Sequence, residues 1–200
     1  QRPAVRNLYY YFLTVLILLF CVGLIGLSPS FAQQGTQAPP VDYRYFSWIE
    51  SRNLVWVIAQ VHLLFGGFVL GVPIFAWVCE IIAVRTKDSR YDKLAKEFTK
   101  LLTASIEMTA MVGAILLFVL LICYPKVMNY LTGIFLPTYY VYIFLFFGET
   151  ITLYLYWSGW ETVHRRRGLH LFLGFLLNVF GFLIMIVANA WATFQASPVV

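Results

Sequence analysis

Charged residues are scarce in this chain of 200 residues: 12% are Asp, Glu, Lys or Arg, whereas 61% are hydrophobic. Soluble domains carry about a quarter charged residues, so the composition excludes an ordinary soluble domain. The net charge of +5 does not indicate nucleic-acid binding, because the basic residues lie between apolar segments. We therefore predict an integral membrane protein.

Cysteine is also rare. The three cysteines, Cys21, Cys79 and Cys123, form no CxxC or CxxCH motif. Their spacing argues against a cysteine metal site and against covalent haem attachment, so we expect them to pack against lipid or other helices. The sequence also shows no inverted repeat and no paired broken helices, which argues against a transporter.

Five apolar stretches are long enough to cross a bilayer, which takes about 20 residues. They lie at roughly 8–30, 53–83, 100–124, 136–158 and 169–194. The first follows two arginines and ends in a small-residue site typical of signal-peptide cleavage. A cleaved signal and a retained anchor helix both fit this pattern, and we favour the anchor.

The predicted fold is an all-α membrane protein, with a four-helix transmembrane bundle and one N-terminal transmembrane or signal-anchor helix. Residues 1–32 are expected to form the anchor, and residues 33–52 a periplasmic linker with an aromatic interfacial segment. Residues 53–200 are expected to form the bundle.

Basic residues predict the orientation. The segments 84–99 and 159–168 are rich in Lys and Arg, whereas 125–135 contains only Lys126. By the positive-inside rule, the two basic segments are cytoplasmic loops. Residues 33–52 and the C-terminus then lie outside, which in a bacterium is the periplasm, and we expect the protein in the bacterial inner membrane.

Three ionisable side chains, His62, Glu107 and Glu149, lie well within the predicted spans. A charged group at the bilayer centre costs at least a few kcal/mol, so such residues usually face a protein interior or a water-filled path. Counted along the helices, Glu107 lies nearest the cytoplasm, Glu149 near the middle, and His62 in the outer half.

His62 has small neighbours that suit a flat ligand. Ala59 and Gly66 lie one turn either side of it, and neutral imidazole is a common axial ligand of haem iron. The alternative is that Gly67 and Gly71 serve helix packing while His62 bonds a neighbouring carbonyl. The residues alone leave both hypotheses open.

The two glutamates also have two interpretations. They could relay protons from the cytoplasm towards His62, or be protonated carboxyls that hydrogen-bond between helices. We expect His164 and His170 to be solvated or in contact with lipid. Packing is the expected role of the methionines Met108, Met111 and Met185.

Several segments together resemble one known family. They are SRNLVWVIAQVHLLFGGFVLG (51–71), YDKLAKEFTKLL, YIFLFFGETITLYLYWSGWE and the closing VANAWATFQASPV (187–199). In combination they are similar to the N-terminal four-helix half of cytochrome bd quinol oxidase subunit I. The resemblance implies that His62 is an axial ligand of a haem, most simply b-type, near the periplasmic side. It also implies that Glu149 belongs to a proton pathway.

The sequence departs from the family in places that bear on activity. AILLFVLLICYP lacks the glutamate-bearing stretch of the family's second helix, and Val141 stands where the third helix carries a further glutamate. The family's low-spin haem ligands and quinol loop belong to later helices. We therefore expect a subunit of an oxidoreductase complex rather than a complete oxidase.

The predicted function is a haem-binding membrane subunit of a multisubunit respiratory electron-transfer complex. Its expected partners are other membrane subunits, and also a periplasmic c-type cytochrome and quinol. The alternatives are one part of a split quinol:oxygen oxidase, and a structural membrane subunit without a cofactor.

Overall fold

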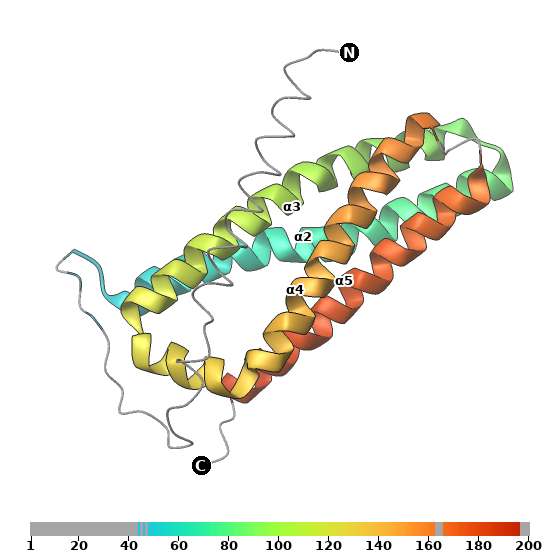
Figure 1. The fold of residues 1–200 in the computed structure, drawn as a ribbon. Helices are drawn as coiled ribbons and strands as arrows, with labels where there is room; N and C mark the ends of the chain where they lie inside the picture. Colours follow the sequence, from blue (N-terminus) through green and yellow to red (C-terminus); the bar gives the residue numbers. More distant parts are fainter. Residues whose placement is uncertain (1–43, 45, 47, 163–165, 197–200) are drawn as a thin grey trace.

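Four long helices make up the part of the chain that the computed structural model describes, which is residues 44, 46, 48–162 and 166–196. They are α2 (Ser51–Thr86), α3 (Ser89–Cys123), α4 (Pro125–Thr162) and α5 (Arg167–Ala196) (Figure 1). These described residues contain no strand, which confirms the all-helical prediction for them. The expected N-terminal helix and Cys21 lie outside the described residues.

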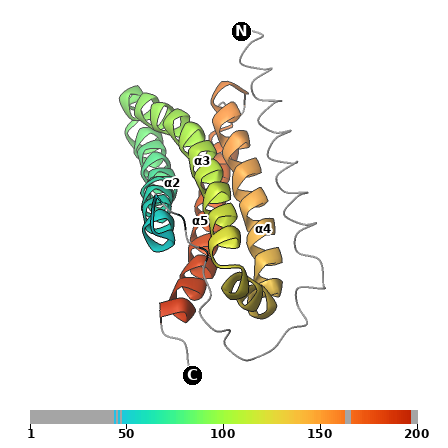
Figure 2. The ribbon, with the colours of Figure 1, turned by 90° about the vertical axis from the view of Figure 1, so that its left-hand side faces the viewer.

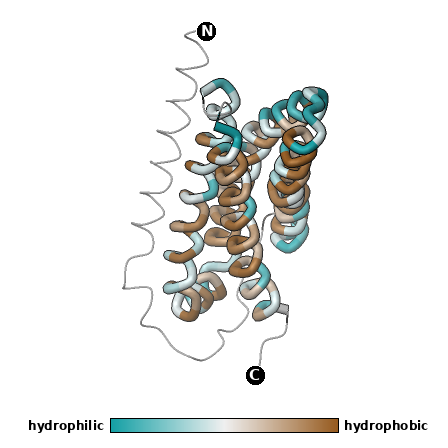
Figure 3. Tube along the Cα trace, turned by 90° about the vertical axis from the view of Figure 1, so that its right-hand side faces the viewer, coloured by the Kyte–Doolittle hydropathy of each residue, from teal (hydrophilic) through white to brown (hydrophobic). Residues whose placement is uncertain are grey.

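All four helices are long and apolar enough to cross a membrane, so the protein is a multi-pass membrane protein. Hydrophobic residues dominate the middle of the helices, whereas hydrophilic residues gather at the turn between α2 and α3 (Figure 3). At 1.5 Å per residue, the 36 residues of α2 extend about 54 Å. The helix is therefore longer than the hydrocarbon core, which is about 30 Å thick.

The basic segment 84–99, predicted as a loop, is mostly helical, so that prediction was wrong; the segment 125–135 between two predicted spans is helical as well. Only Lys87 and Asp88 separate α2 from α3, and Lys87 adopts the left-handed conformation with φ 57°. Asp88 caps α3 by accepting a hydrogen bond from the amide of Arg90. The charged residues that follow lie on an exposed helix face opposite buried Ala95 and Thr99, so their polarity does not end the helix.

The four helices form a ring in which each packs against two others. α2 packs against α3 and α5, and α4 packs against α3 and α5 (Figures 1 and 2). The turn at residues 87–88 lies at the same end as the start of α5, and we call this the basic end. Tyr124, which alone joins α3 to α4, lies at the opposite, distal end.

Cys123, Met128 and Leu131 are buried at the distal end, but the main buried apolar cluster lies in the half of the bundle nearest the basic end. Its members are Val69, Val72, Ala76, Cys79, Ala95, Leu102, Ile106, Leu153, Tyr156, Trp160 and Leu177. In the distal half, Ser51 is the only buried residue of 51–68, and none of 182–195 is buried. The two halves of the bundle therefore differ in how tightly they are packed.

The start of α3 is expected to depend on pH. Hydrogen bonds from the Arg90 side chain and amide lower the pKa of Asp88 below its ordinary 3.8. Because the folded pKa lies below the unfolded one, this stabilisation is complete above pH 3.8 and is lost as the pH falls through the lowered pKa. The protection factor of the Arg90 amide against hydrogen exchange should therefore fall on acidification. In Asp88→Ala it should be low throughout, and equal protection of the wild type at neutral and low pH would contradict the expectation.

Candidate functional site

His62 lies between α2 and α3 in the distal half and is half-buried. Its Nδ1 lies 3.1 Å from the carbonyl oxygen of Thr109 on α3. Because a carbonyl only accepts hydrogen bonds, Nδ1 is the protonated nitrogen and donates to it. Nε2 is then the nitrogen with the lone pair, which is the state of a metal-binding histidine whose other nitrogen donates to a backbone carbonyl.

A glycine of α3 allows the imidazole to take this position. A Cβ built on Gly113 would lie 2.8 Å from Cε1 of His62 and 3.3 Å from its Nδ1. Any larger residue at this point would displace the ring. The hydrogen bond to Thr109 and the absence of a side chain at Gly113 together set the orientation of the imidazole.

The small residues beside His62 are not used for close helix packing within the described chain. A Cβ on Gly66, Gly67 or Gly71 would meet no atom within 4 Å, and Ala59 is half-buried. The packing hypothesis for these glycines therefore finds no contact to support it. The second part of that hypothesis, a hydrogen bond from His62 to a neighbouring carbonyl, is present, and this bond leaves Nε2 available.

These residues fit a flat iron-bearing group. The imidazole has a fixed tautomer, its neighbour Gly66 leaves space beside it, and none of the surrounding residues 52–68 of α2 is buried. Within the described residues, no group of three or more His, Cys, Asp and Glu could hold a metal ion. A single histidine suits a haem, whose porphyrin supplies the other iron ligands.

The two predicted glutamates make different contacts in the structure. Glu107 is half-buried, and its Oε1 accepts a hydrogen bond of 2.8 Å from the hydroxyl of Tyr154 on α4. Glu149 is buried, and a Cβ on Gly181 of α5 would lie 3.1 Å from its Oε1. Each of these carboxyls thus faces a different helix from the one that carries it.

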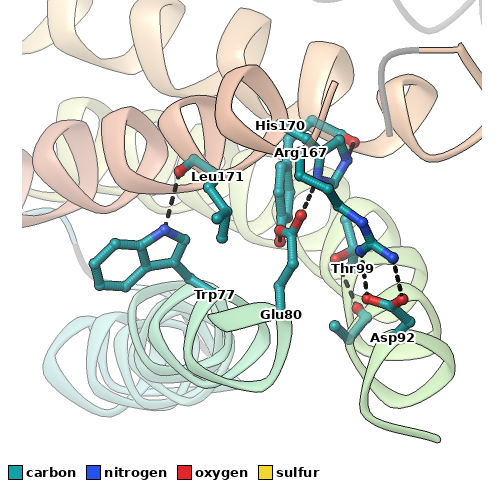
Figure 4. A network of polar contacts seen from close by, with 9 residues as sticks. Trp77, Glu80, Asp92, Thr99, Arg167, His170 and Leu171 are labelled. Atoms are coloured by element: carbon teal, nitrogen blue, oxygen red, sulfur yellow. Dashed lines mark hydrogen bonds and ion pairs between the residues drawn. The ribbon is translucent and has the colours of Figure 1, made fainter. Parts of the chain in front are cut away.

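Sequence reasoning missed a buried polar cluster in the basic half (Figure 4). Nδ1 of His170 on α5 lies 2.7 Å from Oε1 of Glu80 on α2, and both side chains are fully buried. The hydroxyl of Tyr156 on α4 donates to Oε2 of Glu80 over 2.9 Å. The expectation that His170 is solvated or contacts lipid was therefore wrong, because its position on α5 directs its side chain towards the bundle interior. His164 lies outside the described residues.

An ion pair adjoins this cluster one turn earlier on α5. Arg167 binds Asp92 of α3 through two hydrogen bonds of 2.7 and 2.6 Å. The ring of Trp160 packs edge-on against His170, with centroids 4.6 Å apart. Asp92 and Arg167 bring α3 into contact with α5, so side chains from all four helices meet at the basic end.

A sequence signal for Glu80 does exist. Val69, Val72, Ala76 and Ala83 are buried at helical spacing on α2, and Glu80 lies on the same face. This spacing marks Glu80 as facing the bundle interior. His170 has no comparable signal, because α5 is apolar almost all round.

Residues 51–198 match the protein family described as cytochrome bd terminal oxidase subunit I. The chain belongs to this family. Among curated proteins and among solved structures, no match was found. Membership makes the chain a membrane protein related to respiratory oxidases and electron transport, and the family is one that binds haem.

Loss of the Glu80 carboxylate should destabilise the bundle. Glu80→Ala leaves the buried His170 and Tyr156 without their acceptor, and removing one partner of a buried pair costs about 3 kcal/mol or more. Tyr156→Phe removes one hydrogen bond and should cost only about 1 kcal/mol. Thermal unfolding in detergent measures both variants. If Glu80→Ala lost no more stability than Tyr156→Phe, the assignment of Glu80 as the shared acceptor would be contradicted.

Proposed function

We propose that the chain is the haem-binding membrane subunit of a respiratory electron-transfer complex, with His62 as an axial ligand of a b-type haem iron. The observation that carries this proposal is the hydrogen bond from Nδ1 of His62 to the carbonyl of Thr109. It holds the ring in one orientation and leaves Nε2 as the coordinating nitrogen.

The other residues of the proposed haem site act by their small size. Ala59 and Gly66 let the porphyrin approach the backbone of α2, and Gly113 lets His62 lie against α3. When bound, the haem passes single electrons as its iron alternates between the ferrous and ferric states. The chain contributes the ligand, its orientation and an apolar surrounding.

Glu149 and Glu107 are the proposed proton-carrying residues. Glu149 is buried in the middle of α4, away from both ends of the bundle, and a buried ionisable group within a membrane is a functional candidate by default. Glu107 contacts α4 through Tyr154, so the carboxyls of α3 and α4 are both directed between helices.

The proposed location is the inner membrane of a bacterium, with the basic end in the cytoplasm. The Lys and Arg residues near residues 87–88 and Arg166 support this orientation through the positive-inside rule. His62 then lies on the periplasmic side. The proposed partners are other membrane subunits, together with a periplasmic c-type cytochrome and quinol. Exposed apolar residues of the distal half, including Trp56, Leu64 and Phe144, support contacts with such subunits.

A difference spectrum of the purified complex tests the iron ligand. The reduced-minus-oxidised visible spectrum should contain a b-type haem signal that is lost in His62→Ala, because the variant has no nitrogen to bind the iron. Assembly of the complex is checked by gel filtration. An unchanged spectrum in an assembled complex would reject His62 as the ligand and favour a structural subunit.

A glycine substitution tests the orientation of His62 without removing the imidazole. Gly113→Ala introduces a Cβ 2.8 Å from the present position of Cε1, so the ring must move away from Thr109. Haem content per chain should fall several-fold. Gly133→Ala is the matched control, because its Cβ meets nothing within 4 Å, and it should keep its haem. Equal haem content in the two variants would contradict the role of the Thr109 contact.

A further inference from the structure

Glu80, Tyr156 and His170 form a buried cluster that the proposed haem site does not use. Nδ1 of His170 faces Oε1 of Glu80 at 2.7 Å, and Nε2 faces the carbonyl oxygen of Tyr156 at 3.1 Å. Both oxygens of Glu80 are engaged, since Oε2 accepts the hydroxyl of Tyr156. Figure 4 shows Glu80 of α2 directed towards His170.

These contacts determine how many protons the pair holds. A carbonyl oxygen can only accept, so Nε2 of His170 carries a proton. The contact between Nδ1 and Oε1 requires another proton, because neither a bare ring nitrogen nor a carboxylate can donate. A neutral histidine has one ring proton. The second is therefore additional, and lies on His170 as imidazolium or on Glu80 as a carboxylic acid.

Burial favours the same count. Without the additional proton, Glu80 and His170 would together carry one negative charge at full burial, close enough to Arg167 to interact with it electrostatically. With the proton the pair is neutral overall, which avoids the desolvation cost of a buried charge.

We propose that Glu80 and His170 form an intramembrane proton-binding site, which holds one proton between α2 and α5 at the basic end. The site does not depend on haem, because Glu80 lies about 27 Å from His62 along α2. Its ligand is the proton alone, and the donor is water at the basic end.

The position of the site suits it to deliver protons to Glu149. Tyr156, Thr152 and Glu149 are buried at spacings of four and three residues on α4, so they lie on one helix face. The Glu80–His170 pair stands at the basic-end start of this face, where a proton is held before it reaches Glu149. This role, unlike the bound proton, rests on the proposed proton path.

The bound proton can be observed without any haem or activity. The chain has three histidines, so replacing His62 and His164 by Gln leaves His170 as the only imidazole. We would label this variant with ¹⁵N-histidine, purify the full chain in nanodiscs, and record ring-nitrogen spectra at about pH 7. We expect Nε2 to be protonated, together with a strongly low-field proton between Nδ1 and Oε1.

Two outcomes would overturn the site. A neutral imidazole protonated only at Nδ1, with a bare Nε2, would mean that the pair holds no additional proton. The absence of any proton between Nδ1 and Oε1 would mean that Glu80 and His170 do not share one. Both outcomes are read from the parent double variant, which keeps Glu80, so they do not require a destabilised protein.

Two further substitutions locate the proton. Glu80→Gln in the same background should abolish the low-field signal, because the amide cannot share a proton with Nδ1 in this way. Glu149→Gln removes another buried carboxyl of the same bundle and should leave the His170 signals unchanged. A low-field proton that persists in Glu80→Gln would overturn the assignment to the pair.

Discussion

The carboxylate of Glu80 holds together three helices of the bundle, with one oxygen accepting from Tyr156 of α4 and the other facing His170 of α5. Within a membrane this matters more than in water, because lipid tails are as apolar as the helix surfaces and apolar burial gives little drive for association. Helices are then held by close packing and by hydrogen bonds between polar side chains. The ion pair of Arg167 with Asp92 adds α3, so the basic end is where all four helices are joined.

The residues that stabilise the bundle therefore lie in a different half of it from the proposed cofactor site. The apolar core and the polar cluster both lie in the basic half, whereas His62 lies in the distal half with exposed apolar neighbours. A histidine that must bind an additional group benefits from surroundings that are not already filled by side chains. Only two local features of the chain, the carbonyl of Thr109 and the bare backbone of Gly113, are needed to orient it.

The four long helices could be predicted from the length of their apolar runs, but their ends could not. Hydropathy indicates which residues lie in lipid, and the charged first turns of α3 continue as helix in water because Asp88 caps them. His62, Glu107 and Glu149 could be selected because an ionisable residue in an apolar run is unusual. His170 was missed because it was judged by its nearness to the arginine triplet, and Glu80 because it was not considered among the ionisable residues of the spans. Their pairing joins positions 90 residues apart. A local sequence pattern cannot indicate a pair of residues so far apart in the chain.

The short connection between α2 and α3 also affects the position of His62. With only Lys87 and Asp88 between them, α2 and α3 form one arm, a helical hairpin closed at the basic end, in which neither helix can slide far along the other. His62 lies about 27 Å along this arm from Glu80, at 1.5 Å per residue. The short connection therefore fixes the register in which His62 of α2 meets Thr109 and Gly113 of α3, far from the turn itself.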